Sequence, residues 1–216
     1  SDANVDEAVA GALLAKMRNG GAACTAANRV YVQKSIAEQF TKEFSQAMSQ
    51  LKMGKGTESG IQLGASVSIK ERNKIADLVS AAVKAGGKLI LGGTTPEGAG
   101  AFYPATVVTV DKTNPILNSE VFGPVAPIVT FDGDAEAIEL ANATEYGLIS
   151  YVYSSDLKRA IRTAEAIESG MVAINRGVVS DPAAPFGGVK QSGLGREGGF
   201  AGIYEFLETK YIGVEI

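Results

Sequence analysis

The sequence of 216 residues contains no histidine and a single cysteine, Cys24. Without an imidazole base, a cysteine–histidine protease dyad is excluded. A structural zinc site, which needs several Cys or His ligands, is excluded as well, and an intrachain disulfide lacks its second thiol. Two interpretations of the lone cysteine remain. It is either a small buried hydrophobic residue or a nucleophile whose thiolate is stabilised by cations and backbone N–H groups.

Charge and hydropathy exclude further classes of protein. The net charge is −4 and the chain has no basic run, which argues against a nucleic-acid partner. No apolar stretch approaches the ~20 residues that cross a bilayer, so we expect no membrane partner. The acidic segment 1–7 lacks the apolar core of a signal peptide. Because one unpaired cysteine is typical of a reducing compartment, we expect a cytoplasmic protein.

Short apolar runs alternate with amphipathic helical patterns along most of the chain. Helices are expected over residues 6–18, after Ser-x-x-Glu capping boxes at 35–38 and 68–71, and over 135–143, 156–168 and 200–207. Strands are expected over residues 30–32, 88–91, 105–110, 125–131, 148–153, 171–174 and 210–214. This alternation predicts an α/β fold: an open, twisted, mostly parallel sheet with helices on both faces.

The loop around Cys24 has the residues of an accessible site. Gly20 and Gly21 lie four and three residues before the thiol, and glycines let the backbone come close to a ligand. Two alanines follow them and leave the surroundings open. Arg18 and Arg29 stand six residues before and five residues after the cysteine, a cationic setting that favours a thiolate.

Three other loops could contribute to a site. Residues 118–124 place a carboxylate and an aromatic ring two residues apart before a buried strand. Residues 175–185 follow the expected strand 171–174, and ligands of open α/β sheets bind at such strand ends. Residues 185–199 contain six glycines. Their Gly-x-Gly at 193–195 follows no strand, so it is a weak signal for a dinucleotide fingerprint. Each loop, considered alone, can be interpreted as an ordinary turn. Together with the Cys24 loop, the three loops form a recognisable combination of motifs.

That set resembles the aldehyde dehydrogenase family, in the family's order and spacing over nearly the whole chain. The matching motifs are Asn19-x-Gly21-x-x-Cys24 with Asn28-Arg29, Glu120-Val121-Phe122-Gly123-Pro124, and Pro185-Phe186-Gly187-Gly188-x-Lys190-x-Ser192-Gly193-x-Gly195-Arg196-Glu197. Within the family, Arg18, Ser180 and the ending Tyr204–Tyr211 are most similar to the succinate-semialdehyde dehydrogenases.

The resemblance implies an oxidation of an aldehyde to a carboxylate with NAD or NADP. Cys24 would attack the aldehyde to give a thiohemiacetal, a hydride would pass to the nicotinamide, and water would hydrolyse the resulting thioester. The backbone N–H of Cys24 would supply half of an oxyanion hole. Glu120 would hold the nicotinamide ribose, and Phe122 would pack beside the nicotinamide ring. Arg18 and Ser180 would bind the distal carboxylate of the substrate, and Phe186 would line the aldehyde pocket.

Departures from the family pattern leave alternatives open. Ala26 stands where these enzymes often carry a second cysteine, so we expect no redox-switch disulfide. Met17 and the pair Ala22-Ala23 also differ from the usual residues, which leaves glutarate semialdehyde or a neutral aldehyde as possible substrates. A non-catalytic assembly module is the alternative from another class, because the open edge of a final strand could pair with a partner subunit.

The resemblance also implies a division of the chain. Residues 1–200 would form the catalytic α/β domain, and residues 201–216 a helix end and an oligomerisation strand. The amino-terminal cofactor-binding domain would lie outside this chain. We therefore expect a homo-oligomer in the full-length protein and no metal site. We also expect an isolated chain that folds but turns over little or no aldehyde.

Overall fold

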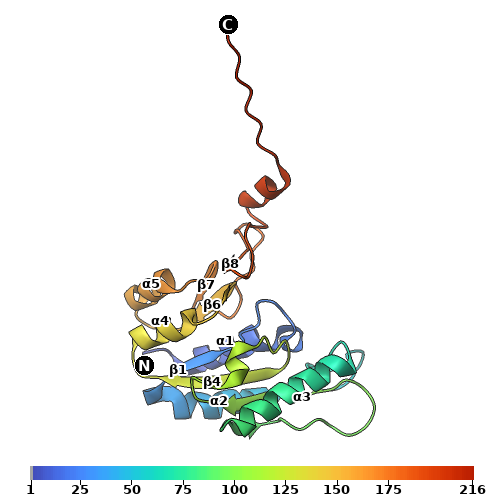
Figure 1. Cartoon of the computed structure of the whole chain (residues 1–216). Helices are drawn as coiled ribbons and strands as arrows, with labels where there is room; N and C mark the ends of the chain where they lie inside the picture. Colours follow the sequence, from blue (N-terminus) through green and yellow to red (C-terminus); the bar gives the residue numbers. More distant parts are fainter. Residues whose placement is uncertain (1) are drawn as a thin grey trace.

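A computed structural model describes residues 2–216, and Figure 1 shows how its elements are arranged. The α-helices are α1 (Val5–Met17), α2 (Ala37–Ser49), α3 (Ile69–Lys84), α4 (Asp134–Asn142) and α5 (Leu157–Ala166). The strands are β1 (Val30–Gln33), β2 (Lys88–Leu91), β3 (Thr106–Thr109), β4 (Val125–Phe131), β5 (Tyr146–Gly147), β6 (Ile149–Val152), β7 (Met171–Ile174) and β8 (Val189–Lys190). Short 3-10 helices span Arg18–Gly21, Lys34–Ile36, Pro115–Asn118 and Ala201–Phe206.

The strands form one four-stranded sheet and two separate pairs. The sheet has the order β1-β4-β3-β2, in which β1 and β3 run parallel to β4 and β2 runs antiparallel to β3. Strands β6 and β7 form a parallel pair, and β5 pairs with β8 in antiparallel fashion. The predicted α/β fold with mostly parallel strands is confirmed. The single sheet that the sequence suggested is divided, within residues 2–216, between β1 and β6.

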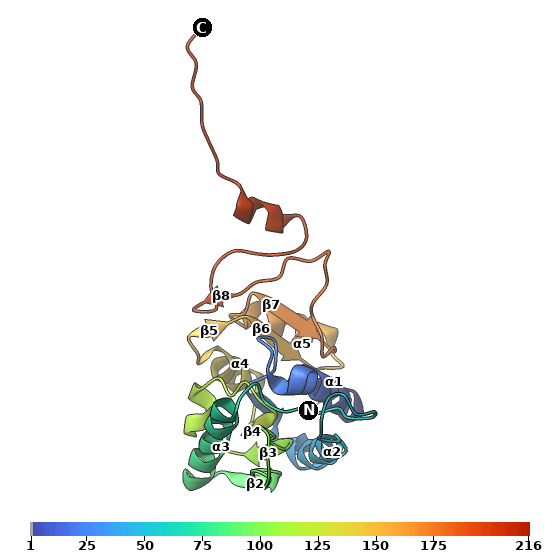
Figure 2. The same ribbon diagram turned by 90° about the vertical axis from the view of Figure 1, so that its right-hand side faces the viewer.

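Both faces of the four-stranded sheet are covered by helices. Figure 2 shows α1 and α2 on one side of it and α3 and α4 on the other. Successive residues of β3 point to opposite faces: Val107 packs with Phe44 of α2, and Val108 packs with Ile75 of α3. Burial on both faces explains why β3 and β4 are near-continuous apolar runs in the sequence.

One of the two expected capping boxes begins a helix. Ser68 caps α3, and its hydroxyl oxygen accepts a hydrogen bond of 3.2 Å from the Glu71 N–H. The box at Ser35 was wrong. Both the N–H and the hydroxyl of Ser35 bind the side-chain oxygen of Gln33, so Ser35 lies in a 3-10 turn and α2 begins later, at Ala37. The hydrogen bonds of Ser35 to the nearby Gln33 side chain thus take the place of the expected capping interaction.

The carboxyl-terminal segment extends away from the body of the molecule in both views (Figures 1 and 2). The α-helix expected at 200–207 is a 3-10 helix over Ala201–Phe206. Residues 207–216 are extended, but the strand expected at 210–214 has no partner strand within the described chain. None of the described helices combines the length and the apolar character needed to cross a membrane.

Candidate active site

Cys24 lies in the connection between α1 and β1, and its side chain is exposed. After α1 ends at Met17, the chain takes a tight turn in which Asn19, Gly20 and Gly21 have φ values of 51°, 61° and 79°. Asn19 tolerates this left-handed conformation because its amide nitrogen donates 2.8 Å to the carbonyl oxygen of Ala22. The turn therefore holds the cysteine at the surface rather than in the core.

Gly21 allows the cysteine loop to touch the loop that carries Glu120. A Cβ atom at position 21 would lie 2.2 Å from the carbonyl oxygen of Gly123, and its φ of +79° is also unfavourable for other residues. Only glycine meets both requirements. The Gly21 of the sequence motif is thus explained by a close approach of two backbones that stand about a hundred residues apart in the chain.

Asn28 fixes the same two loops to each other from the other end. Its side-chain nitrogen donates 2.7 Å to the Ser119 carbonyl oxygen, and its side-chain oxygen accepts 2.9 Å from the Val121 N–H. Glu120 is held between these two anchored residues and is itself exposed. Phe122 follows with φ of +52° and 40% of its surface exposed. Asn28 therefore presents Glu120 and Phe122 on the side of Cys24.

A cavity of about 620 Å³ brings together three of the residues that the sequence singled out. Cys24, Glu120 and Phe122 all line it, as do Gln191 and Ser192 of the glycine-rich loop. Ser192 is held there because its hydroxyl oxygen accepts a hydrogen bond of 3.0 Å from the N–H of Gly147, the last residue of β5. The cysteine, the carboxylate and the glycine-rich turn are thus parts of one site.

The three residues expected to bind substrate are placed differently. Arg18, Ser180 and Phe186 are absent from the lining of this cavity. Arg18 is exposed at the start of the turn before Cys24. Ser180 is exposed in the loop after β7, and Phe186 is half-buried, with its backbone paired to Glu197. The described chain by itself does not bring these three side chains into the cavity.

Tyr151 connects Arg18 to the cysteine loop. Its hydroxyl donates 2.9 Å to the Thr25 carbonyl oxygen, next to Cys24. Burial raises the pKa of Tyr151, while the Thr25 bond and the positive charge of Arg18 act in the opposite direction and a charged Cys24 would raise it further. Arg18 and Cys24 therefore both lie within electrostatic reach of the same phenol.

Arg29 has a structural role that sequence reasoning did not predict. Its guanidinium donates to the carbonyl oxygens of Leu140, Ala141 and Ala143, at distances of 3.2 to 3.3 Å, at the carboxyl end of α4. A cation there satisfies free carbonyl groups and the helix dipole. The hydrogen-bond donors of Arg29 are therefore engaged at the end of α4, and the expectation that its charge supports a Cys24 thiolate stays a prediction.

Lys16 is the residue of the site that sequence reasoning missed. It lies in the last turn of α1, lines the cavity and has only 1% of its surface exposed. Burial lowers the pKa of Lys16 to about 8, and the negative charge of Glu120 partly opposes this change. The available signal was its position four residues after Ala12, on the face of α1 that turns inward.

The glycine-rich loop is fixed by Lys190 and Arg196. The Lys190 ammonium donates 3.1 and 3.2 Å to the carbonyl oxygens of Asn142 and Thr144 and forms an ion pair with Glu168. The Arg196 guanidinium donates 2.8 Å to the carbonyl oxygen of Gly188. These cations of the third sequence motif therefore hold loop backbone and do not point at Cys24.

The arrangement suits a nucleophilic cysteine with a nicotinamide cofactor nearby. The Cys24 N–H donates no hydrogen bond to any group within residues 2–216, so it is available to a substrate oxygen. The exposed carboxylate of Glu120 can accept hydrogen bonds from ribose hydroxyls, and the exposed ring of Phe122 offers an apolar surface beside it. No cluster of three or more metal-binding side chains occurs among the described residues.

Comparisons with known proteins agree with this site. The sequence profile of the aldehyde dehydrogenase family matches residues 1–212. A succinate-semialdehyde dehydrogenase of Paenarthrobacter nicotinovorans is 53% identical over 214 residues, which cover 99% of this chain and 48% of that protein. A glutarate-semialdehyde dehydrogenase of Pseudomonas putida is 44% identical over 215 residues, which cover 100% of this chain and 45% of that protein.

The fold is also that of a solved relative. The crystal structure of an NADP-dependent enzyme of E. coli superposes with a TM-score of 0.95 at 42% identity, covering 98% of this chain and 44% of that one. The chain thus spans about half the length of the curated relatives it matches. Because the family profile covers nearly all of its residues and includes the cysteine loop, this chain belongs to the aldehyde dehydrogenase family.

Proposed function

We propose that this chain is the catalytic part of an NAD- or NADP-dependent aldehyde dehydrogenase that oxidises succinate semialdehyde to succinate. The observation that carries the proposal is the exposure of the only cysteine on a cavity that Glu120 and Phe122 also line. A residue kept only for packing would be buried. The relative named a succinate-semialdehyde dehydrogenase, at 53% identity, supports the choice of substrate.

The proposed reaction begins with addition of the Cys24 sulfur to the aldehyde carbon. The carbonyl oxygen then becomes an alkoxide, which the Cys24 N–H stabilises, and this step gives a thiohemiacetal. A nicotinamide cofactor held by Glu120 and Phe122 would supply the oxidant, as the acceptor of a hydride, and loss of that hydride from the thiohemiacetal carbon would leave a thioester on Cys24. Water then attacks the thioester carbon, the carboxylate departs, and the sulfur is released as thiol or thiolate.

In the proposal, Glu120 and Phe122 hold the nicotinamide end of the cofactor through ribose hydroxyls and ring packing. The buried ammonium of Lys16 attracts the Glu120 carboxylate, and in the proposal this attraction favours a Glu120 side chain that faces the cavity. The likeness to the NADP-dependent enzyme of E. coli supports a nicotinamide dinucleotide as cofactor. We expect the rest of the cofactor to bind outside this chain, and the isolated chain to produce little or no NADH or NADPH in a steady-state assay.

Arg18 carries the preference for an aldehyde that also bears a carboxylate. A guanidinium binds a carboxylate through charge-assisted, bidentate hydrogen bonds, which a neutral aldehyde cannot form. In the proposal, Ser180 and Phe186 join Arg18 around the substrate in the full-length protein, since the described chain by itself does not bring these three side chains into the cavity. Glutarate semialdehyde is the second candidate substrate, because it differs by one methylene and the Pseudomonas putida relative at 44% identity carries that name.

Alkylation of Cys24 tests the proposal on the chain itself. Because no other cysteine is present, iodoacetamide labelling followed by mass spectrometry reports on this site alone. We expect rapid labelling of the folded protein, slowed by succinate semialdehyde but not by the neutral aldehyde butanal. Arg18→Met should abolish that difference, whereas Arg162→Met, at an exposed position of α5, should preserve it.

Two results would contradict the proposal at different levels. If Cys24 of the folded protein is labelled as slowly as a buried thiol, Cys24 is not the nucleophile and the enzymatic assignment is wrong. Equal protection by both aldehydes, unaffected by Arg18→Met, would leave an aldehyde dehydrogenase but overturn the preference for an acidic substrate.

Residues 201–216 support the proposal of a homo-oligomer. Phe206, Tyr211 and Ile212 are 85%, 92% and 74% exposed, and an extended apolar segment of this kind is suited to pairing with a second chain. Light scattering should show an oligomer that truncation after residue 200 dissociates. A monomer in both cases would remove this part of the proposal and leave the catalytic part unaffected.

A further inference from the structure

The turn that carries Cys24 is closed by a hydrogen bond between its two ends. The Ala26 N–H donates 2.9 Å to the carbonyl oxygen of Ala23, so Cys24 and Thr25 form the corner of a β-turn. The carbonyl of Ala23 and the N–H of Cys24 belong to one planar peptide group. Whatever orients the Ala23 carbonyl therefore also orients the Cys24 N–H.

A side chain from a distant strand holds the other end of this turn. The hydroxyl of Tyr151, in β6, donates 2.9 Å to the carbonyl oxygen of Thr25, across 126 positions of sequence. The Thr25 carbonyl and the Ala26 N–H again share one peptide group. This peptide group is thus bound on one side by the phenol and on the other side by the Ala23 carbonyl.

The two hydrogen bonds form a continuous chain that leads to Cys24. The chain runs from the Tyr151 hydroxyl to the Thr25 carbonyl, and then from the Ala26 N–H to the Ala23 carbonyl. The next group in line is the Cys24 N–H, which donates to no group within residues 2–216. All donors of the chain point in the same sense, and hydrogen bonds in such a chain polarise one another. The Cys24 N–H is therefore a free donor that the bonds behind it strengthen.

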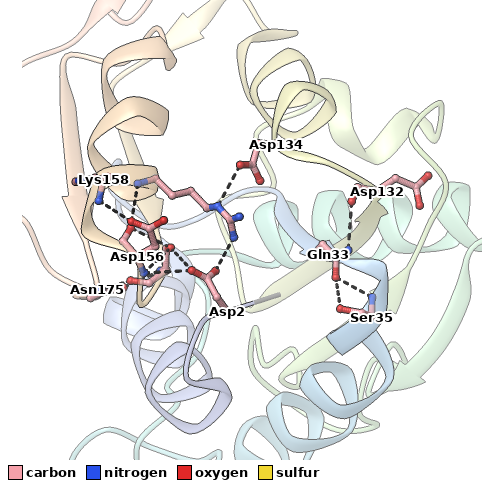
Figure 3. A network of polar contacts seen from close by, with 10 residues as sticks. Asp2, Gln33, Ser35, Asp132, Asp134, Asp156, Lys158 and Asn175 are labelled. Atoms are coloured by element: carbon pink, nitrogen blue, oxygen red, sulfur yellow. Dashed lines mark hydrogen bonds and ion pairs between the residues drawn. The ribbon is translucent and has the colours of Figure 1, made fainter.

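Strand β6 gives the phenol a fixed support. Directly after β6, the backbone N–H and carbonyl of Ser154 bind the side chain of Asn175 at 3.0 and 2.8 Å. The Asp2 carboxylate accepts 2.8 Å from the Ser154 hydroxyl and 3.1 Å from the Asp156 N–H. Figure 3 shows Asp2, Asp156 and Asn175 gathered at this end of the strand. Because Asp2 comes just before α1, β6 is tied both to the start of α1 and, through Tyr151, to the turn that follows it.

We propose that Tyr151 is a positioning residue for the proposed reaction, which acts through two peptide groups to aim the Cys24 N–H at the aldehyde oxygen and to strengthen it as a donor. The inference rests on the proposed function. When the Cys24 thiolate adds to the aldehyde, the sulfur–carbon bond forms, the carbonyl π bond breaks, and the negative charge moves to the oxygen. A donor that already points at this oxygen stabilises the alkoxide without reorganisation.

Replacement of Tyr151 by phenylalanine tests this role, because it removes the hydroxyl and keeps the ring. Aldehyde addition is measured on the 216-residue chain as protection of Cys24 from iodoacetamide by increasing concentrations of succinate semialdehyde. Tyr151→Phe should raise the concentration that gives half-protection about fivefold, the effect of one ordinary hydrogen bond. Tyr153→Phe is the matched control. The Tyr153 hydroxyl is buried without a hydrogen-bond partner within residues 2–216, so its loss should leave protection unchanged.

Alkylation without aldehyde separates positioning from a general change of the cysteine loop. Burial raises the pKa of Tyr151, so the phenol stays neutral while a thiol titrates. The rate of alkylation and the midpoint of its pH profile should therefore be the same in Tyr151→Phe and in the unsubstituted chain. Hydrogen exchange of the Ala26 amide is an independent measurement. It should be faster in Tyr151→Phe but not in Tyr153→Phe, because the turn opens more often without the phenol.

The possible failures are distinguishable. Unchanged protection in Tyr151→Phe, an equal loss of protection in Tyr153→Phe, or a shifted midpoint of the alkylation profile would each overturn this inference and leave the proposed function standing. If succinate semialdehyde does not protect even the unsubstituted chain, the proposed function is wrong, and the inference that rests on it is wrong as well.

Discussion

Replacement of Lys16 by methionine should make this protein more stable at neutral pH. The Lys16 side chain is fully buried, and burial lowers its pKa from 10.5 to about 8, with Glu120 opposing the change. One pKa unit corresponds to about 1.4 kcal/mol, so the charged ammonium costs the folded state about 3 kcal/mol below pH 8. Methionine has a similar length and no charge, and it removes this cost.

The pH dependence gives the sharper form of this prediction. Between pH 8 and pH 10.5 the unfolded chain keeps the Lys16 proton and the folded chain has lost it, so the free energy of unfolding rises with pH. The free energy of unfolding of the unsubstituted protein should therefore rise, relative to that of the variant, by about 1.4 kcal/mol per pH unit in this window. Tyr103, whose pKa burial raises to about 12, lowers stability above pH 10 in both proteins and cancels in the comparison.

Urea unfolding followed by circular dichroism, at intervals from pH 7 to pH 10.5, measures this difference. Lys42→Met is the matched control, because Lys42 is exposed in α2 and its replacement should change stability by less than about 0.5 kcal/mol. A Lys16→Met variant that is less stable at pH 7, or a difference that does not vary with pH, would refute the reasoning.

Three further substitutions test the contacts that shape the site. Gly21→Ala should lower the free energy of unfolding by about 2 kcal/mol or more, because its Cβ would lie 2.2 Å from a facing carbonyl oxygen; Gly56→Ala, with no atom within 4 Å, is the control in urea unfolding. Asn28→Ala should cost about 1–3 kcal/mol and speed proteolysis of the loop it anchors, and unchanged cleavage would contradict that role. The pKa of Asp2 is lowered from 3.8, mainly because its carboxylate accepts a hydrogen bond from the Ser154 hydroxyl. Asp2→Asn should therefore lower the melting temperature at pH 7 by an amount that vanishes as the pH falls through this lowered pKa, and a difference that persists in acid would be evidence against the assignment.

The sequence predicts the bounds of three strands. β2, β4 and β7 span Lys88–Leu91, Val125–Phe131 and Met171–Ile174, as predicted, because each is a short, mostly apolar run whose ends are marked by polar residues, glycine or proline. The segment 210–214 has a similar pattern but no neighbouring strand among the described residues. A strand needs a partner, and local sequence does not contain that information.

Failures at the helix ends and in the site have another physical origin. Ser35 has the spacing of a capping residue, yet Gln33 provides a nearer acceptor for its N–H and hydroxyl. Lys16 has the periodicity of a residue facing the cavity, but a charged residue on a helix is ordinarily expected in solvent. In both cases the outcome depends on which neighbour is closest in space, which helical periodicity does not determine.

The first two family motifs in this chain encode the meeting of two loops more than they encode chemistry. Gly21 lets the cysteine loop touch Gly123, and Asn28 binds Ser119 and Val121 across more than ninety residues of sequence. Cys24 is the only member of the first motif that the proposed reaction consumes and regenerates. Such contacts at long sequence separation are invisible to periodicity, although the motif records them as fixed residue types. A variant that keeps Cys24 but loses Asn28 should therefore retain a reactive thiol while Glu120 and Phe122 are displaced from it.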